Sequence, residues 1–166
     1  MTQWSRASTT RVGVVVIGLA TLITFASVGF FSGTVPTTTS PTLIVTDANG
    51  TELVTAPIDP ETEITIEYTH SVERTLVRDV YVVTDAGTLA MVRMEFSSFG
   101  AGLPAQAEVT QENGRYVYEP TNREYETLRI RTGHIADHDL IVGDERYDIA
   151  AMTDGGSVKL TIENRR

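Results

Sequence analysis

The stretch that decides the fold is residues 77–96, VRDVYVVTDAGTLAMVRMEF. Two runs rich in β-branched and aromatic residues, 77–84 and 88–96, flank the triplet Asp85-Ala86-Gly87. A three-residue loop that ends in glycine is typical of a type I turn closed by a G1 bulge. The stretch therefore predicts a β-hairpin in which Thr84 lies opposite Thr88.

This register has consequences for both faces of the hairpin. On one face Val80 is expected opposite Val92, as part of an apolar surface that packs on the core. On the other face Asp79 is expected opposite Arg93, and opposite charges at such positions form a favourable cross-strand pair. We therefore interpret Asp79 and Arg93 as a structural ion pair.

Candidate site residues gather in the two segments at the open end of this hairpin, 70–74 and 97–104. A regular hairpin brings both segments to the same end of one structural unit, so they are expected to face each other. The residues that we single out for ligand binding or docking are His70, Ser71, Glu73, Arg74, Arg78, Ser98, Phe99, Gly100, Gly102 and Leu103.

The residue types in these segments favour binding of a small carboxylate or docking of a partner. Arginine side chains at 74 and 78 can hold a carboxylate through paired hydrogen bonds. The N–H groups of a glycine-rich loop can point at the same anion. Alternatively, Phe99 and Leu103 dock another protein, or the loop only caps one end of the domain.

Two enzymatic hypotheses remain as alternatives, both centred on His70. Imidazole together with the carboxylates of Glu73, Asp79 and Glu95 can bind a divalent metal or transfer protons. Each of these side chains also has a structural explanation, such as a covered histidine at a strand end. We therefore expect a binding module without cofactor or resident metal, and keep a metal-dependent enzyme as the alternative.

A hydrolase built on Ser71 is the second enzymatic hypothesis. It needs a base within hydrogen-bonding reach of the serine, together with an orienting acid and an oxyanion hole. Neighbours on a strand point to opposite faces, so His70 is poorly placed to serve Ser71. His134 and His138 are the other histidines that remain as bases.

Short strand-like runs with turn signals between them continue on both sides of the hairpin. They predict an all-β fold over residues 43–166, an antiparallel β-sandwich or partly closed barrel. In residues 62–70 the apolar residues share one parity, and His70 falls on it. Asn49-Gly50-Thr51 is a hairpin turn signal and also an N-glycosylation acceptor pattern at Asn49. The expected strands are 43–46, 51–54, 62–70, 77–84, 88–96, 107–110, 115–118, 126–132, 139–142, 146–149 and 157–163.

The amino-terminal part of the chain has the pattern of a membrane anchor. Residues 12–31 are twenty uncharged, mostly apolar residues, and Arg6 and Arg11 precede them. Such a helix crosses the hydrocarbon core, and the positive-inside tendency places residues 1–11 in the cytoplasm. A cleaved signal peptide is the competing interpretation. Residues 32–42, rich in threonine with two prolines, are expected to be a linker, so that residues 43–166 form an extracytoplasmic domain on the cell membrane.

Charge and composition exclude some classes of partner. The net charge is −9, and all 22 acidic residues lie at or after Asp47, which argues against nucleic-acid binding. Lys159 is the single lysine, and an acidic, lysine-poor surface is halophile-like or reflects a GC-rich genome. The chain has no cysteine, which excludes disulfides and thiolate metal sites.

Two motifs resemble the prokaryotic domain of unknown function family numbered 1850. They are His-Ser-Val-Glu-Arg at 70–74 and Phe-Ser-Ser-Phe-Gly-Ala-Gly-Leu-Pro at 96–104, with an acidic residue at 79 between them. This chain has Leu76 and Asp79 where the family pattern leads us to expect proline and glutamate. The resemblance implies an exported or membrane-attached protein without established activity. It also implies an accessory role in uptake of small organic anions by tripartite periplasmic (TRAP-type) transporters of the TAXI class.

Overall fold

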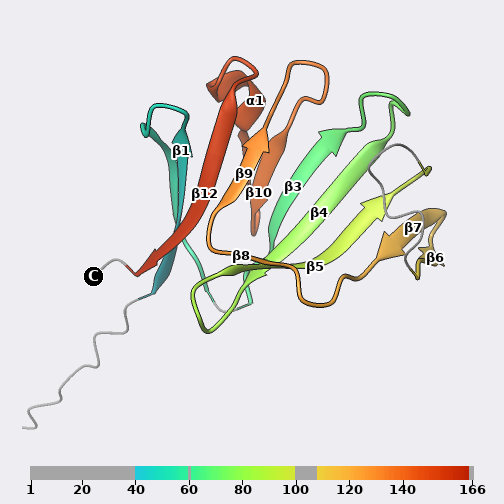
Figure 1. Ribbon diagram of the computed structural model, residues 1–166, viewed down its shortest axis with the longest axis horizontal. Helices are drawn as coiled ribbons and strands as arrows, with labels where there is room; N and C mark the ends of the chain where they lie inside the picture. Colours follow the sequence, from blue (N-terminus) through green and yellow to red (C-terminus); the bar gives the residue numbers. More distant parts are fainter. Residues whose placement is uncertain (1–39, 60, 100–107, 165–166) are drawn as a thin grey trace, which may run out of the picture. The chain divides into compact units, whose positions relative to one another are not determined.

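Antiparallel strands make up most of the described part of the chain, residues 40–59, 61–99 and 108–164 of the computed structural model (Figure 1). They form a four-stranded sheet with the order β2-β1-β12-β9 and a larger sheet with the order β11-β10-β3-β4-β5-β7-β6, where β8 also pairs with β5. The all-β, antiparallel prediction is confirmed. The strands are β1 Pro41–Asp47, β2 Glu52–Pro57, β3 Ile64–Thr69, β4 Leu76–Val83, β5 Leu89–Phe96, β6 Thr110–Glu112, β7 Arg115–Tyr118, β8 Glu124–Tyr125, β9 Leu128–Arg131, β10 Asp139–Val142, β11 Glu145–Asp148 and β12 Ser157–Asn164.

The hairpins form where the turn signals predicted them. Gly87 has φ +76° and its N–H donates to the carbonyl of Thr84, which closes the β4–β5 turn. Gly50 has φ +86° in the β1–β2 turn, and glycine adopts this left-handed region without the steric cost of a Cβ. Short turns also join β6 to β7 and β10 to β11. Local sequence therefore determines much of the strand order in the larger sheet.

Two long-range pairings complete the sheets. The last strand, β12, pairs with β1, so that Pro41 lies opposite Asn164. β10 returns to pair with β3 along its whole length. Sequence pattern alone does not specify these partners, because any exposed strand edge can accept a neighbour.

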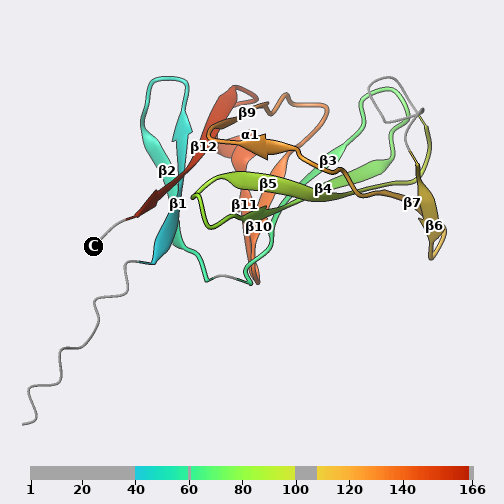
Figure 2. The same ribbon diagram turned by 60° about the horizontal axis from the view of Figure 1, so that its bottom comes forward.

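One stretch of chain belongs to both sheets. β8 pairs with β5 of the larger sheet, and after two further residues the chain continues as β9, which pairs with β12 of the four-stranded sheet. In Figure 2 this orange segment passes from one sheet to the other. β9 is therefore an edge strand of the four-stranded sheet, and it lies near the inward face of the larger sheet.

The core lies between residues from both sheets. Leu43, Val45 and Leu160 of the four-stranded sheet are completely buried, as are Ile64 and Phe96 of the larger sheet. All of them belong to one hydrophobic cluster. Truncating a side chain of this kind to alanine typically costs about 2–5 kcal/mol of stability, so this cluster holds the two sheets together.

The β4–β5 hairpin differs from its predicted register. Tyr81 pairs with Met91 but Val80 pairs with Arg93, so Val92 is an extra residue on β5 and forms a β-bulge. From the bulge to the open end of the hairpin, every pairing shifts by one position. Residues that were expected to lie opposite each other there do not.

The predicted Asp79–Arg93 pair is therefore wrong. Asp79 lies opposite Met94, and the side chain of Arg93 bonds to Glu95 and Glu112 at 2.8 Å each. Asp79 shares the inward face of β4 with Tyr81, which is part of the hydrophobic cluster. Val80, expected on the inward face, lies on the opposite one.

Smaller differences concern the ends of elements. The first strand begins at Pro41, inside the predicted linker 32–42, and Ile149 starts a one-turn helix, α1 (Ile149–Met152), instead of ending a strand. Residues 12–31, predicted to span the membrane, and 32–39 lie outside the described residues. Within the described ranges, no helix has the length and apolar character needed to cross a membrane.

Deleting Val92 should test whether the bulge specifies the register. The deletion removes the extra residue, so one half of β5 must turn its side chains to the wrong face. We expect a loss of roughly 4 kcal/mol or more in the free energy of unfolding, enough to unfold most domains. Urea denaturation followed by circular dichroism measures it.

The matched control is Val92→Ala, which keeps the residue count. Val92 is exposed, so its truncation should change stability by less than about 0.5 kcal/mol. A deletion variant as stable as the wild type would show that the bulge is not required.

Candidate functional site

The first candidate site is the corner formed by His70, Glu73, Thr75 and Ser98. His70 is buried, with 9% of its surface exposed, and its Nδ1 accepts a hydrogen bond from the backbone N–H of Glu73 at 3.2 Å. The hydroxyl of Ser98 lies 3.4 Å from the Glu73 carboxylate and 3.4 Å from the Thr75 hydroxyl. The structure thus brings together the two segments that flank the β4–β5 hairpin, at least through Ser98.

The remaining predicted residues take different positions. Ser71 and Arg74 are exposed in the turn after β3, where Arg74 has φ +53°. Phe99 is 44% exposed and packs against Phe96 and Tyr116, with ring centroids 5.2 and 4.5 Å away. Gly100, Gly102 and Leu103 lie outside the described residues, so their predicted role is not addressed.

The Arg78 guanidinium, predicted to bind a carboxylate, already has one. Its Nε donates to Glu67 at 2.6 Å, and Glu67 also accepts from Arg146 of β11. Ion pairs of this kind on the solvent side are worth little individually, about 0–1 kcal/mol. Arg78 therefore belongs to an ion network on the solvent side, away from the inward-facing Asp79.

The four side chains considered for metal binding do not converge. Asp79 faces inward on β4, whereas Glu95 bonds to Arg93 on the other side of the sheet. The Glu73 carboxylate lies 3.4 Å from the Ser98 hydroxyl. In the part of the chain that the structure describes, no three His, Asp or Glu side chains are grouped to hold a metal ion.

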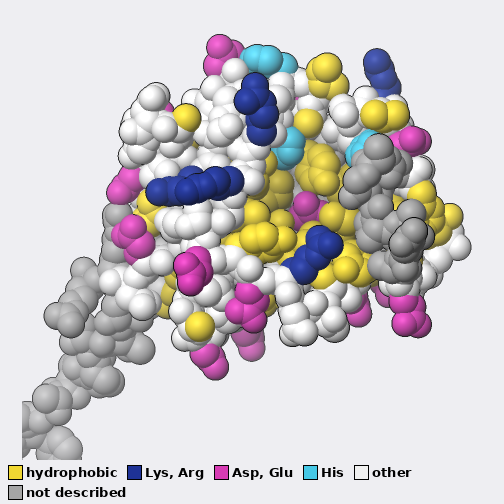
Figure 3. Space-filling model, viewed as in Figure 1, with side chains coloured by type: hydrophobic (Ala, Val, Ile, Leu, Met, Phe, Trp, Pro, Cys, Tyr) yellow, Lys and Arg dark blue, Asp and Glu magenta, His cyan; other side chains and the backbone are white. Residues whose placement is uncertain are grey.

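A second candidate site centres on Asp79. This carboxylate lies in a hollow of about 350 Å³ between the inward face of β3 and β4 and the edge strand β9. The walls include Tyr68, Tyr81, Ile130 and His138. Figure 3 shows this hollow on the face toward the viewer, with an acidic side chain surrounded by hydrophobic ones. We call it the Asp79 hollow.

The Asp79 carboxylate lacks hydrogen-bond partners for one of its oxygens. Its Oδ1 is shielded from solvent and has no hydrogen-bond partner. Burial raises the pKa of this carboxyl to about 7, and the positive charge of Arg123 counteracts part of that rise. A carboxyl group in this setting is close to half protonated at neutral pH, so it can act as a hydrogen-bond donor or as an anion.

Arg129 and Arg131 bring positive charge to the wall of the hollow, whereas its tyrosines and its histidine are neutral. Burial, reinforced by the negative charge of Asp79, raises the pKa of Tyr68 and of Tyr81 far above their usual value. Burial lowers the pKa of His138. Near neutral pH, Asp79 is therefore the group in the walls of the hollow whose charge can change.

His138 is held in place from two sides. Its ring stacks on Tyr68, with centroids 4.8 Å apart, and its Nδ1 donates to the carbonyl of Thr132. These contacts fix the tautomer of the neutral imidazole and leave its Nε2 as an acceptor. Tyr68 and His138 thus form a rigid wall, which is what a preformed binding site requires.

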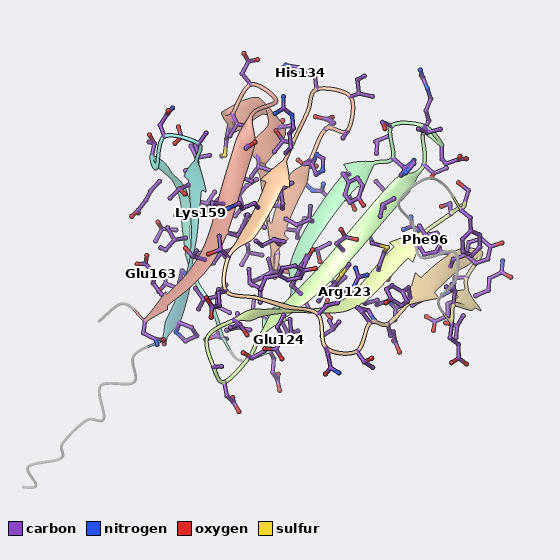
Figure 4. All side chains as sticks on the ribbon, viewed as in Figure 1. Phe96, Arg123, Glu124, His134, Lys159 and Glu163 are labelled. Atoms are coloured by element: carbon purple, nitrogen blue, oxygen red, sulfur yellow. The ribbon has the colours of Figure 1, made fainter. Side chains whose placement is uncertain are left out.

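Arg123 stands at the rim of the hollow. Its backbone carbonyl accepts a hydrogen bond from the N–H of Met91 at 2.8 Å, beside the bulge on β5. Its guanidinium lies 5.8 Å from the centre of the Tyr118 ring, and its charge acts on both Asp79 and Tyr81. Figure 4 labels Arg123, and in Figure 3 a basic side chain lies below the acidic one that hydrophobic side chains surround.

Sequence reasoning missed this site because it assigned Asp79 to the solvent face. The neighbours Val80 and Val82 are as apolar as Val77 and Tyr81, so alternation did not choose between the two faces of β4. The sequence also offered Arg93 as a basic partner, so Asp79 did not stand out as an unpaired carboxylate.

The fold and the Asp79 hollow define an antiparallel all-β domain with a titratable carboxyl group in an open hollow. The chain belongs to the family described as Domain of unknown function (DUF1850), whose model matches residues 64–149. This match includes His70, Asp79 and all lining residues of the hollow. Comparison with curated proteins and with solved structures gives no match.

Replacing Asp79 by asparagine should remove a pH-dependent loss of stability. A carboxyl whose pKa rises from 3.8 to about 7 on folding keeps its proton better in the folded state. Stability then falls as the pH rises between these values and is constant above them. We expect Asp79→Asn to match the wild type near pH 4 and to exceed it by up to roughly 4 kcal/mol at pH 8.

Urea denaturation of the full chain at several pH values measures this difference. The matched control is Asp144→Asn in the exposed β10–β11 turn, which should leave the pH dependence unchanged. Parallel wild-type and Asp79→Asn curves over the whole pH range would contradict a raised pKa for Asp79.

Proposed function

We propose that this protein is a membrane-anchored, extracytoplasmic binding module that holds a small organic anion in the Asp79 hollow. In this proposal the module assists uptake by a TRAP-type transporter of the TAXI class. The observation that carries the binding role is the Oδ1 atom of Asp79, which is shielded and has no partner at the floor of a hollow. Such an atom costs stability until a ligand satisfies it.

The groups around Asp79 favour a carboxylate with an apolar body. Tyr68, Tyr81 and Ile130 offer apolar surface to the carbon skeleton of a ligand. Protonated Asp79 donates a hydrogen bond to the ligand carboxylate, and Arg123 at the rim supplies a positive charge. The hollow lies at the lower end of the usual volume range for small-ligand sites, about 300–1,000 Å³, so the ligand is small.

The proposed membrane location and the proposed transporter partner rest on other features of the chain. The apolar run 12–31 after two arginines supports a membrane anchor with the domain outside the cytoplasm. The family resemblance supports a transporter as partner. Phe99, 44% exposed beside Tyr116, supports a docking point at the corner near Ser98, separate from the Asp79 hollow.

The second candidate function is a hydrolytic or metal-dependent enzyme of the cell surface centred on His70. The observation in its favour is the cluster of His70, Glu73 and Ser98 in one corner. The two functions respond differently to substitution. His70→Ala should abolish turnover by an enzyme, whereas it should leave binding in the Asp79 hollow intact.

Binding of benzoate and hexanoate to the full chain tests the role of the hollow. We expect the affinity to fall as the pH rises through about 7, because ionised Asp79 repels the ligand carboxylate. Asp79→Asn should bind without this pH dependence, since its amide still donates. Asp79→Ala, which donates nothing, should lose about tenfold in affinity or more.

Isothermal titration calorimetry at several pH values measures these affinities, with Asp144→Asn as the control for a lost negative charge. If neither probe binds, or if Asp79→Ala binds as the wild type does, the hollow is not the carboxylate site.

Capture of the full chain from native membranes tests the transport role separately. A TRAP-type subunit should be recovered with the wild type and with Asp79→Ala, but less with Phe99→Ser, which removes the exposed ring. Mass spectrometry identifies the captured proteins. If the wild type recovers no transporter subunit, the accessory role fails, while the binding role is judged on its own experiment.

A further inference from the structure

A larger hollow lies on the four-stranded sheet, away from the Asp79 carboxyl. Its volume is about 680 Å³, and it is bounded by the β1–β2 turn and by parts of β12 and β9. Seven polar side chains line it, two of them Asp47 and Asn49, and we call the site the basic hollow after three of the others. The remaining five are Thr46, Arg129, Arg131, Ser157 and Lys159.

The strand register brings these side chains to one face. Lys159 lies opposite Thr46 on one side and opposite Arg129 on the other, so the three form a row across the sheet. Ser157 lies opposite Arg131 in a second row. Residues directly opposite each other are about 5 Å apart, and the next row along the strands is about 7 Å away.

This row points away from the core. Val45, Val158 and Leu128, which alternate with Thr46, Lys159 and Arg129 along their strands, belong to the hydrophobic cluster. β9 therefore lies between the two hollows, and its residues Arg129, Ile130 and Arg131 line both of them. In Figure 3 basic side chains gather over β12 and β9 in the left half of the view, and Figure 4 labels Lys159 there.

The charges in this row are not neutralised within the described residues. Arg129, Arg131 and Lys159 form no ion pair there, whereas Arg78, Arg93, Arg115 and Arg146 all do. Asp47, the acidic residue in the lining, accepts hydrogen bonds from the N–H groups of Asn49 and Thr51 at 2.8 Å each. Like charges directly opposite each other destabilise a sheet, so Lys159 beside Arg129 is unfavourable unless an anion lies between them.

Thr46 gives an independent indication of a ligand. Its side chain is 8% exposed, and its Oγ1 is a buried atom without a hydrogen-bond partner. Leaving a buried polar group unsatisfied costs about 1–3 kcal/mol. The hydroxyl can donate to an anion oxygen bound beside Lys159.

We propose that the basic hollow is a second binding site, for a small polyvalent oxyanion. Lys159, Arg129 and the Thr46 hydroxyl hold one acidic group of the ligand, and Arg131 with Ser157 holds another in the next row. Phosphate and carboxylate groups share this chemistry, so diphosphates and tricarboxylates are both of the right class. The site does not depend on ligand binding at Asp79.

Titration calorimetry of the full chain with pyrophosphate and with citrate tests the proposal. Binding of either anion is expected, and which of the two binds more tightly distinguishes a phosphate ligand from a carboxylate ligand. Lys159→Met and Arg129→Gln should each weaken binding about tenfold or more. Arg146→Gln removes the same charge outside the hollow and should change the affinity less than threefold.

Thr46→Val keeps the experiment decisive even where a charge variant fails to fold. Removing an unsatisfied hydroxyl should leave the folded state as stable as before or more stable, yet weaken anion binding. Asp79→Asn should bind pyrophosphate as the wild type does, which separates this site from the Asp79 hollow. No binding of either anion at about 10 mM, or equal weakening by Arg146→Gln and Lys159→Met, overturns the proposal.

Discussion

One extra residue in β5 determines which side chains of that strand reach the core and which residues of β4 they oppose. The bulge at Val92 lets two residues of β5 oppose one residue of β4, which reverses the facing of residues 93–96 relative to a regular strand. On the open edge of β5, the same region is where pairing changes from β8 to β7, with the carbonyl of Arg123 bonded to Met91 between them. The bulge thus places Met94, and not Arg93, opposite Asp79, which faces inward because it alternates with Val77 and Tyr81 on β4.

The parts of the fold that sequence predicts are those encoded locally. Glycines with positive φ at 50, 87 and 114 mark turns, and alternation identifies β3 and β12. What local pattern does not encode is the partner of an edge strand or the position of a bulge. In residues 77–83 both parities are apolar apart from Arg78 and Asp79, so either face satisfies the pattern. The two-residue strand β8 and the single-turn helix α1 are too short to produce a periodic signal.

The candidate sites also differ in whether local sequence predicts the positions of their residues. The corner of His70, Glu73 and Ser98 was predictable because two unusual segments flank one hairpin, and hairpin geometry alone places them together. The Asp79 hollow was not predictable, because its walls come from β3, β4, β9 and His138, which become neighbours through long-range pairing. The ion pair of Arg78 was not predictable for a related reason. Its partner Glu67 lies opposite it only after β3 and β4 are aligned.

In this acidic protein, the groups best suited to bind a ligand are buried polar atoms that lack a hydrogen-bond partner. Along the solvent side of the larger sheet, carboxylates meet arginines, as Glu67 meets Arg78 and Glu95 meets Arg93. Three buried side-chain atoms of the described residues have no hydrogen-bond partner, and one of them, Nη1 of Arg115, lies 3.6 Å from a Glu95 oxygen. The other two, on Asp79 and Thr46, line two hollows that share Arg129, Ile130 and Arg131 of β9 as a common wall. Folding alone gains nothing from an unsatisfied polar atom in a wall. A ligand in each hollow that forms a hydrogen bond with the unsatisfied atom there would account for both atoms.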